Sequence, residues 1–157
     1  ATQWVAINAS NAPAARYGHS AAWTGDQMLI WGGLGSNGSP LANGGAYDPV
    51  TDTWTALSTT NAPAARYGHN ALWTGQELLI LNGAGASGEL ASGSAYDPLS
   101  GRWRALSQSG SPQARMEAAA VWSGTEVLVF GGRANSQILG SLQRLVPQPI
   151  WYFYRKL

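Results

Sequence analysis

The chain has 157 residues, about the size of one domain, and 45% of them are hydrophobic, which is enough for a core. Nine basic residues against eight acidic ones give a net charge of +1. We therefore expect no nucleic-acid partner, because such partners are bound by clustered Lys and Arg. No apolar run is long enough for a membrane helix. Because the chain has no cysteine, disulfides, thiolate metal sites and cysteine nucleophiles are excluded.

An internal repeat explains the unusual content of twenty Gly and eight Trp. Residues 11–19 return unchanged as residues 61–69, about fifty residues later. The third copy keeps Arg115, but Met116, Glu117 and Ala118 stand where the other copies have Tyr, Gly and His. The sequence thus predicts one domain of three repeats, over about residues 8–57, 58–106 and 107–157, with residues 1–7 as an extra terminal strand.

Each repeat predicts four short β-strands, which in the first copy cover residues 17–23, 27–32, 44–47 and 53–57. The first two strands are separated by Thr24-Gly25-Asp26, and the last two by a turn that begins at Asp48-Pro49. The second strand is continuously apolar, so we expect it to be buried on both faces. No window has helical periodicity with caps, and the predicted fold class is all-β.

The repeated motifs resemble those of the kelch family, in particular its bacterial galactose-oxidase-like branch. In the first copy they are Arg16-Tyr17-Gly18-His19, Gly32-Gly33, Tyr47-Asp48-Pro49 and Trp54. The resemblance covers the whole chain and implies a β-propeller, in which each blade is a four-stranded sheet. The copper-radical cofactor of the name-giving oxidase needs a Cys-crosslinked Tyr and is excluded here. Low Lys and high Gly, Ser, Thr and Trp also resemble exported bacterial propellers.

Three blades cannot close a ring, because propellers have about four to eight blades. Either the chain is part of a longer propeller, or identical copies associate to finish the ring. We expect a homodimer of two half-propellers with six blades in total. Residues 4–7 and 150–155 both read as outer strands, so one of them is surplus or crosses to the partner by strand addition.

The kelch resemblance places the repeat arginines and tyrosines at one mouth of the channel: Arg16, Tyr17, Arg66, Tyr67 and Arg115. In a closed dimer, six guanidinium groups would suit a small anionic ligand or a partner segment. The competing interpretation pairs each Arg with an acid such as Asp48 or Asp97. The first functional hypothesis is therefore a self-associating binding module whose channel mouth holds the ligand.

A second hypothesis makes the protein a zinc-dependent hydrolase of phosphate or sulfate esters. Dimerisation would gather His19, His69 and Glu117 from both subunits near one axis, and imidazole and carboxylate are common zinc ligands. The competing interpretation makes these histidines buried residues that bond to backbone. The tryptophans of the repeat are expected in the core: Trp23, Trp54, Trp73, Trp103 and Trp122.

Overall fold

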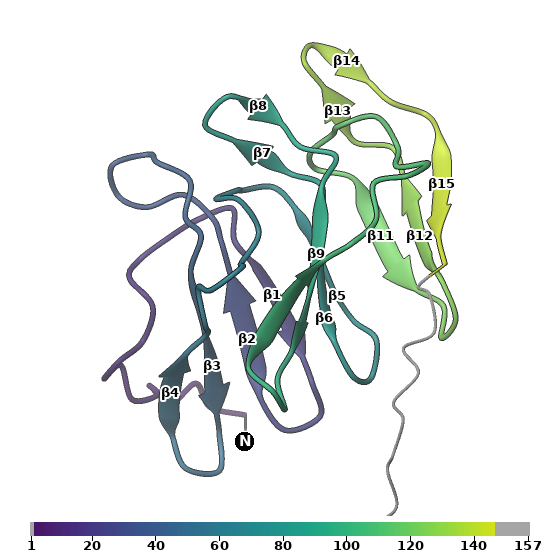
Figure 1. Cartoon of the computed structure of the whole chain (residues 1–157). Helices are drawn as coiled ribbons and strands as arrows, with labels where there is room; N and C mark the ends of the chain where they lie inside the picture. The colour runs from purple at the N-terminus through teal and green to yellow at the C-terminus, as the bar shows by residue number, and fades with distance from the viewer. Residues whose placement is uncertain (1, 147–157) are drawn as a thin grey trace, which may run out of the picture.

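The computed structural model describes residues 2–146, and these form fifteen β-strands and no helix (Figure 1). The predicted all-β class is confirmed. Within the described part, no helix is long and apolar enough to cross a membrane.

Each repeat forms one antiparallel sheet, which we call a blade. Blade 1 has the strand order β1 (Ser20–Trp23), β2 (Met28–Trp31), β3 (Gly44–Asp48) and β4 (Thr53–Ala56). Blade 2 has the order β5 (Asn70–Trp73), β6 (Leu78–Leu81), β9 (Gly93–Asp97) and β10 (Arg102–Ala105). Among the described residues, blade 3 has three strands, β11 (Ala119–Trp122), β12 (Val127–Phe130) and β15 (Leu142–Leu145). Two small hairpins extend from one end of blades 2 and 3: β7 (Ala84–Gly85) with β8 (Gly88–Glu89), and β13 (Arg133–Ala134) with β14 (Gln137–Ile138).

Repeated turn chemistry fixes the same register in every blade. Trp23 pairs with Met28, and Trp73 pairs with Leu78 in the same way. Between these strands the Thr24 Oγ1 accepts a hydrogen bond from the Gln27 N–H at 3.0 Å, and Thr74 does the same for Glu77. A hydroxyl that accepts a backbone bond within a turn closes it locally.

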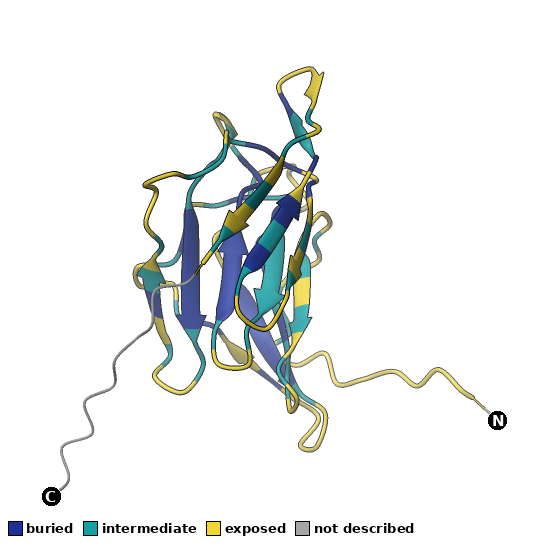
Figure 2. Cartoon of the chain, turned by 90° about the vertical axis from the view of Figure 1, so that its right-hand side faces the viewer, coloured by how far each residue is buried: buried dark blue, intermediate teal, exposed yellow. Residues whose placement is uncertain are grey.

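The blades stack like a fan around their first strands, because β1 contacts β5 and β5 contacts β11 (Figure 1). Two apolar layers hold the stack. Between blades 1 and 2 the buried side chains are Leu29, Trp31, Ala46, Leu57, Leu78, Ile80, Tyr96 and Trp103. Between blades 2 and 3 they are Leu79, Leu81, Ala95, Ala118, Val127 and Val129. Figure 2 shows this burial concentrated in the middle of the molecule.

The second strands show which blade faces are covered. All four residues of β6 are buried, as the sequence predicts. The prediction is wrong for β2 and β12, in which buried residues alternate with more exposed ones. The reason is that blade 2 lies between two neighbours, whereas in the described part of the chain blades 1 and 3 each have a neighbour on one face alone. The three sheets therefore form an open arc.

Two expectations about particular segments need correction. Residues 4–7 form no strand, and Trp4 is fully exposed, because blade 1 already has β4 as its outer strand. The expected strand over residues 150–155 lies outside the described residues. Among the repeat tryptophans, Trp54 and Trp103 are buried, but Trp23 is 54% exposed because it faces the uncovered side of blade 1.

Candidate functional site

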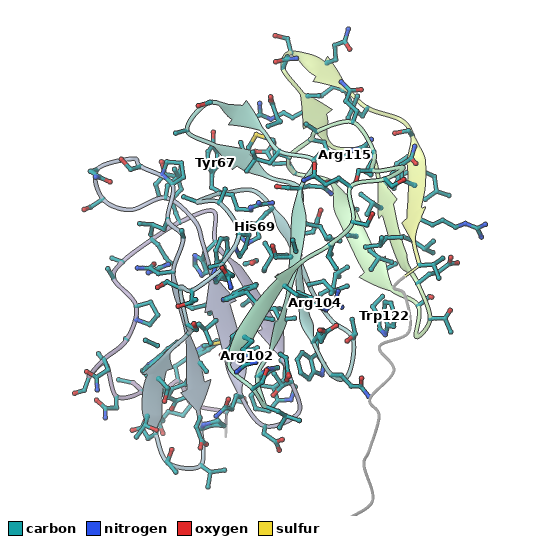
Figure 3. All side chains as sticks on the ribbon, in the orientation of Figure 1. Tyr67, His69, Arg102, Arg104, Arg115 and Trp122 are labelled. Carbon is teal, nitrogen blue, oxygen red and sulfur yellow. The ribbon has the colours of Figure 1, made fainter. Side chains whose placement is uncertain are left out.

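The predicted ligand residues lie at one end of the blades, which we call the loop face. It carries the segments before β1, β5 and β11, together with the β7–β8 and β13–β14 hairpins (Figure 1). Figure 3 shows Tyr67 and Arg115 near this end, with His69 deeper between the blades. The opposite end carries the β1–β2 and β3–β4 turns and their counterparts in blade 2, and we call it the turn face.

The guanidinium of Arg66 bonds mainly to backbone carbonyls of its own blade. Its Nε donates to Ala64 O at 3.0 Å, and its Nη1 donates to Asn82 O at 2.8 Å and Ser92 O at 2.7 Å. Its Nη2 donates to Ser92 Oγ at 2.9 Å. The side chain is 1% exposed, and this burial lowers the pKa of Arg66 to about 10, so that it stays charged at neutral pH.

The other two arginines repeat this pattern. Arg16 Nη1 donates to Gly32 O and Asn43 O, each at 3.0 Å. Arg115 Nη1 donates to Gly131 O at 2.9 Å, and its Nη2 donates to the hydroxyl of Ser141 at 3.1 Å. Each guanidinium thus ties the end of the second strand to the approach of the third strand. This arrangement holds the loop face in shape.

The predicted pairing of these arginines with Asp48 or Asp97 is wrong. Both carboxylates lie at the turn face, where Asp48 Oδ1 accepts from the Val50 N–H at 2.8 Å and Asp97 Oδ1 accepts from the Leu99 N–H at 2.9 Å. The backbone bond from Val50 lowers the pKa of Asp48, and the Ser100 hydroxyl, helped by the backbone bond from Leu99, lowers the pKa of Asp97. The aspartates therefore close turns far from the loop face.

The tyrosines are better placed than the arginines to meet a partner. The Tyr17 side chain is 63% exposed, and Tyr67 is partly buried. Their backbones are fixed, because Tyr17 pairs with Leu34 and Tyr67 with Ala84 through two hydrogen bonds each. Fixed backbones present the phenol groups to solvent at little cost in conformational entropy.

The three predicted metal ligands occupy different environments. His69 is buried and its Nε2 lies 2.5 Å from Ser20 Oγ, while His19 is exposed. Glu117 accepts from Arg133 Nε at 2.8 Å. Within residues 2–146 of one chain, no group of three His, Asp or Glu side chains could hold a metal ion. A zinc site shared between two subunits stays a prediction.

Glycines join neighbouring blades at the loop face. The Gly33 N–H donates to Arg66 O at 2.8 Å, and the Gly83 N–H donates to Arg115 O at 2.7 Å. A Cβ on Gly83 would lie 2.6 Å from His69 Cβ and 2.8 Å from Tyr67 O. The second glycine of each Gly-Gly phase is thus required by close approach within its own blade, while its N–H links that blade to the next one.

Sequence reasoning missed the polar contacts that the eroded third copy adds to the loop face. Glu117 has a φ of 56°, and the equivalent Gly18 and Gly68 have φ values of 63° and 58°. Its carboxylate holds Arg133, while Glu89 accepts from the Asn135 N–H at 2.9 Å. The signal available in the sequence was the replacement of a repeat glycine by a charged residue.

The repeated sheets, the stacked blades and the shared arginine position define a propeller-type repeat protein. The chain belongs to the kelch-repeat family: the family model described as the KLHDC2/KLHL20/DRC7 Kelch-repeats domain matches residues 1–151. The galactose-oxidase-like branch stays a prediction. No curated protein matches the chain significantly.

Proposed function

We propose that this chain is a kelch-type protein-interaction module that self-associates into a closed propeller and uses its loop face to bind a segment of a partner protein. Kelch-repeat domains as a class mediate protein interactions, and this supports the general assignment. The observation that carries the self-association is that both ends of the blade arc expose apolar sheet faces.

The exposed face of blade 1 is apolar. It carries Trp23, Met28 and Ile30, and a shallow hollow of about 440 Å³ lies on it, lined by apolar residues that include Ile7 and Ala21. The exposed face of blade 3 carries Val121, Phe130 and Leu142, each more than half exposed. Contiguous apolar faces of this kind mark protein–protein contacts.

A two-fold axis can cover both faces at once. The blade 1 face of each copy would pack on the blade 3 face of the other, which yields two identical contacts and six blades. Backbone bonding supports the same geometry. Gly132 has the phase of Gly33 and Gly83, so its N–H would donate to Arg16 O of the second copy.

Light scattering coupled to size exclusion tests self-association. We expect twice the chain mass for the unaltered protein and a shift to monomer for Phe130→Asp. Ile138→Asp is the matched control, since Ile138 is also apolar and more than half exposed but lies on the β13–β14 hairpin. A folded monomer at all concentrations, or equal behaviour of both variants, would contradict the proposal.

On the loop face, the exposed Tyr17 and the partly buried Tyr67 favour a polypeptide segment over a small anion, because the arginine donors already bond to backbone carbonyls. Selection of random peptides on the immobilised chain tests this assignment. We expect selected peptides to lose at least tenfold in affinity for Tyr17→Ala/Tyr67→Ala, with no competition by phosphate or sulfate. Competition by these anions would instead favour the small-ligand form of the hypothesis.

A further inference from the structure

A hollow lies between blades 2 and 3, beside the outer edge of β15. It has a volume of about 210 Å³, and its lining includes Leu81, Leu106, Ser107, Val129 and Leu145. An apolar cavity of about 150 Å³ is large enough to hold benzene, so this hollow can take a bicyclic aromatic side chain. We call it the blade 3 socket.

The repeat shows what belongs in the socket. One blade earlier, the equivalent position is filled by Trp103 of the outer strand β10. Trp103 packs against Trp31 and Tyr96 at ring-centroid distances of 5.7 and 4.9 Å, and its Nε1 donates to Ser58 O at 2.7 Å. The repeat register aligns these three contacts with residues that line the socket: Leu81, Leu145 and Ser107.

The socket is open because blade 3 has no outer strand among the described residues. β3 and β9 each pair with an outer strand, whereas β15 pairs with β12 alone. Within residues 2–146, the backbone groups on its outer edge therefore have no strand partner, and they lie next to the socket. A free strand edge of this kind is a template for an added strand.

Residues 4–7 have the sequence of the missing strand. Trp4-Val5-Ala6-Ile7 has the phase of Trp54-Thr55-Ala56-Leu57 and of Trp103-Arg104-Ala105-Leu106. In both of those segments the tryptophan is buried on the sheet, whereas Trp4 is fully exposed. Within residues 2–146, the chain thus carries an outer-strand segment that pairs with no sheet and a sheet that has no outer strand.

The segment cannot reach β15 of its own chain without closing the ring. Asn8 is held on blade 1, where its N–H donates to Asp52 Oδ1 at 3.0 Å and its Nδ2 donates to Asp52 O at 3.2 Å. Blade 1 and blade 3 stand at opposite ends of the arc, and beyond Ile7 the described N-terminal end of the chain leads away from the sheets (Figure 2). In a dimer whose blade 1 packs on the partner's blade 3, however, the segment starts next to the partner's β15.

We propose that the N-terminal segment of a second copy adds to β15 as the fourth strand of blade 3 and inserts Trp4 into the blade 3 socket. This inference rests on the proposed self-association and names the segment that seals it. The register follows from blades 1 and 2, in which Tyr47 pairs with Trp54 and Tyr96 with Trp103. Trp4 then lies opposite Leu145, and Val5 lies opposite Arg144.

Cysteine crosslinking tests this register, and the chain offers a clean background because it has no native cysteine. Under mild oxidation, Val5→Cys/Arg144→Cys is expected to give a disulfide-linked dimer. The matched control is Val5→Cys/Arg102→Cys, because Arg102 is also exposed but lies on β10, whose edge belongs to blade 2. The single variant Val5→Cys reports chance coupling between two exposed segments. Crosslinking no greater than in these controls would overturn the register.

Sedimentation of Trp4→Ala tests the socket. We expect its dimer dissociation constant to rise at least tenfold, with unchanged strand content by circular dichroism. Trp151→Ala is the comparison, because Trp151 lies outside the described residues and could fill the socket from the same chain. If Trp151→Ala weakens folding and Trp4→Ala leaves the dimer unchanged, the chain completes its own blade and the inference is wrong. That result leaves a dimer built on the blade faces standing, whereas a monomeric native protein would contradict both.

Discussion

Ser20 and His69 link blade 1 to blade 2 through a hydrogen bond of 2.5 Å between Ser20 Oγ and His69 Nε2. The next blade contact uses the residue after the same histidine, because Asn70 Nδ2 donates to Ala118 O at 2.7 Å. Each contact between described blades therefore includes a side-chain hydrogen bond from the first residue of a blade's first strand, which is Ser20 in β1 and Asn70 in β5. The His69 ring also packs edge-on against Trp31, 5.6 Å between centroids.

The environment of His69 predicts that acid weakens folding. Burial is the main reason that the pKa of His69 falls from 6.5 to about 3, and the charge of Arg66 adds to it. A protonated ring would also need an acceptor for Nδ1, which is buried and has no hydrogen-bond partner among the described atoms. Below pH 6.5 the unfolded chain binds a proton that the folded chain does not, so stability falls as the pH falls. The expected slope is about 1.4 kcal/mol of unfolding free energy per pH unit.

Urea unfolding between pH 7.5 and pH 5 measures this slope before most carboxyl groups titrate. His69→Gln is expected to be less stable at pH 7.5 but to lose most of the slope in this window. His19→Gln serves as the control, because His19 is exposed and should leave the slope in place. A slope that is the same with and without His69 would show that the buried ring does not control the acid response.

We predict that the stability of the fold depends strongly on the planar geometry of the Arg66 guanidinium. Its planar group reaches Ala64, Asn82 and Ser92 at once, whereas an ammonium at the same place cannot match these directions. Arg66→Lys should therefore cost about 3 kcal/mol of unfolding free energy, because buried carbonyl acceptors lose their donors. Arg16→Lys should cost less, since Arg16 is only partly buried. Denaturant titration of both variants checks the ranking, and equal losses would contradict a role for burial.

The repeat made most of the fold predictable. Strand positions in blades 1 and 2 follow from apolar runs and turn residues that recur at one spacing, and the structure confirms them within a few residues. The prediction that the second strand of each blade is buried on both faces was wrong for β2 and β12. The sequence of β2 is as apolar as that of β6, yet only β6 has a blade on each side. The burial of a strand depends on how many blades pack against its sheet, and the local sequence pattern does not contain this information.

The shared position of the predicted ligand residues could be foreseen, and their role in binding stays a prediction. Arg16, Arg66 and Arg115 do occupy equivalent positions at one end of the blades, as their shared repeat phase indicates. Their backbone acceptors could not be foreseen, because they lie up to 27 residues away and meet only after the blade folds. The link between His69 and Ser20 was missed for the same reason, since it joins two different blades.

We predict that a side chain at Gly83 crowds its own blade, where the segment before β5 approaches the end of β6. Gly83→Ala should lower the free energy of unfolding by more than about 3 kcal/mol, because a Cβ would meet His69 Cβ at 2.6 Å and the φ of 92° strains any other residue. Gly75→Ala separates the two causes. Gly75 has a similar φ of 96° but nothing within 4 Å of a Cβ, so only the backbone cost of about 1–2 kcal/mol should remain. Equal losses in urea unfolding would mean that the close approach of Gly83 to His69 within blade 2 does not limit stability.

We predict that Glu117→Gly stabilises the third repeat or leaves its stability unchanged. Its φ of 56° is a left-handed conformation that glycine adopts in the other two copies. Glu117→Gly removes that backbone cost and loses an ion pair with Arg133 that is open to water and therefore weak. We expect the midpoint temperature of unfolding to rise or stay unchanged, with a gain in the free energy of unfolding of at most about 1 kcal/mol. Glu117→Ala loses the same ion pair but keeps the left-handed backbone, so it should be the less stable of the two. If the alanine variant is the more stable one, the carboxylate and not the backbone governs this position.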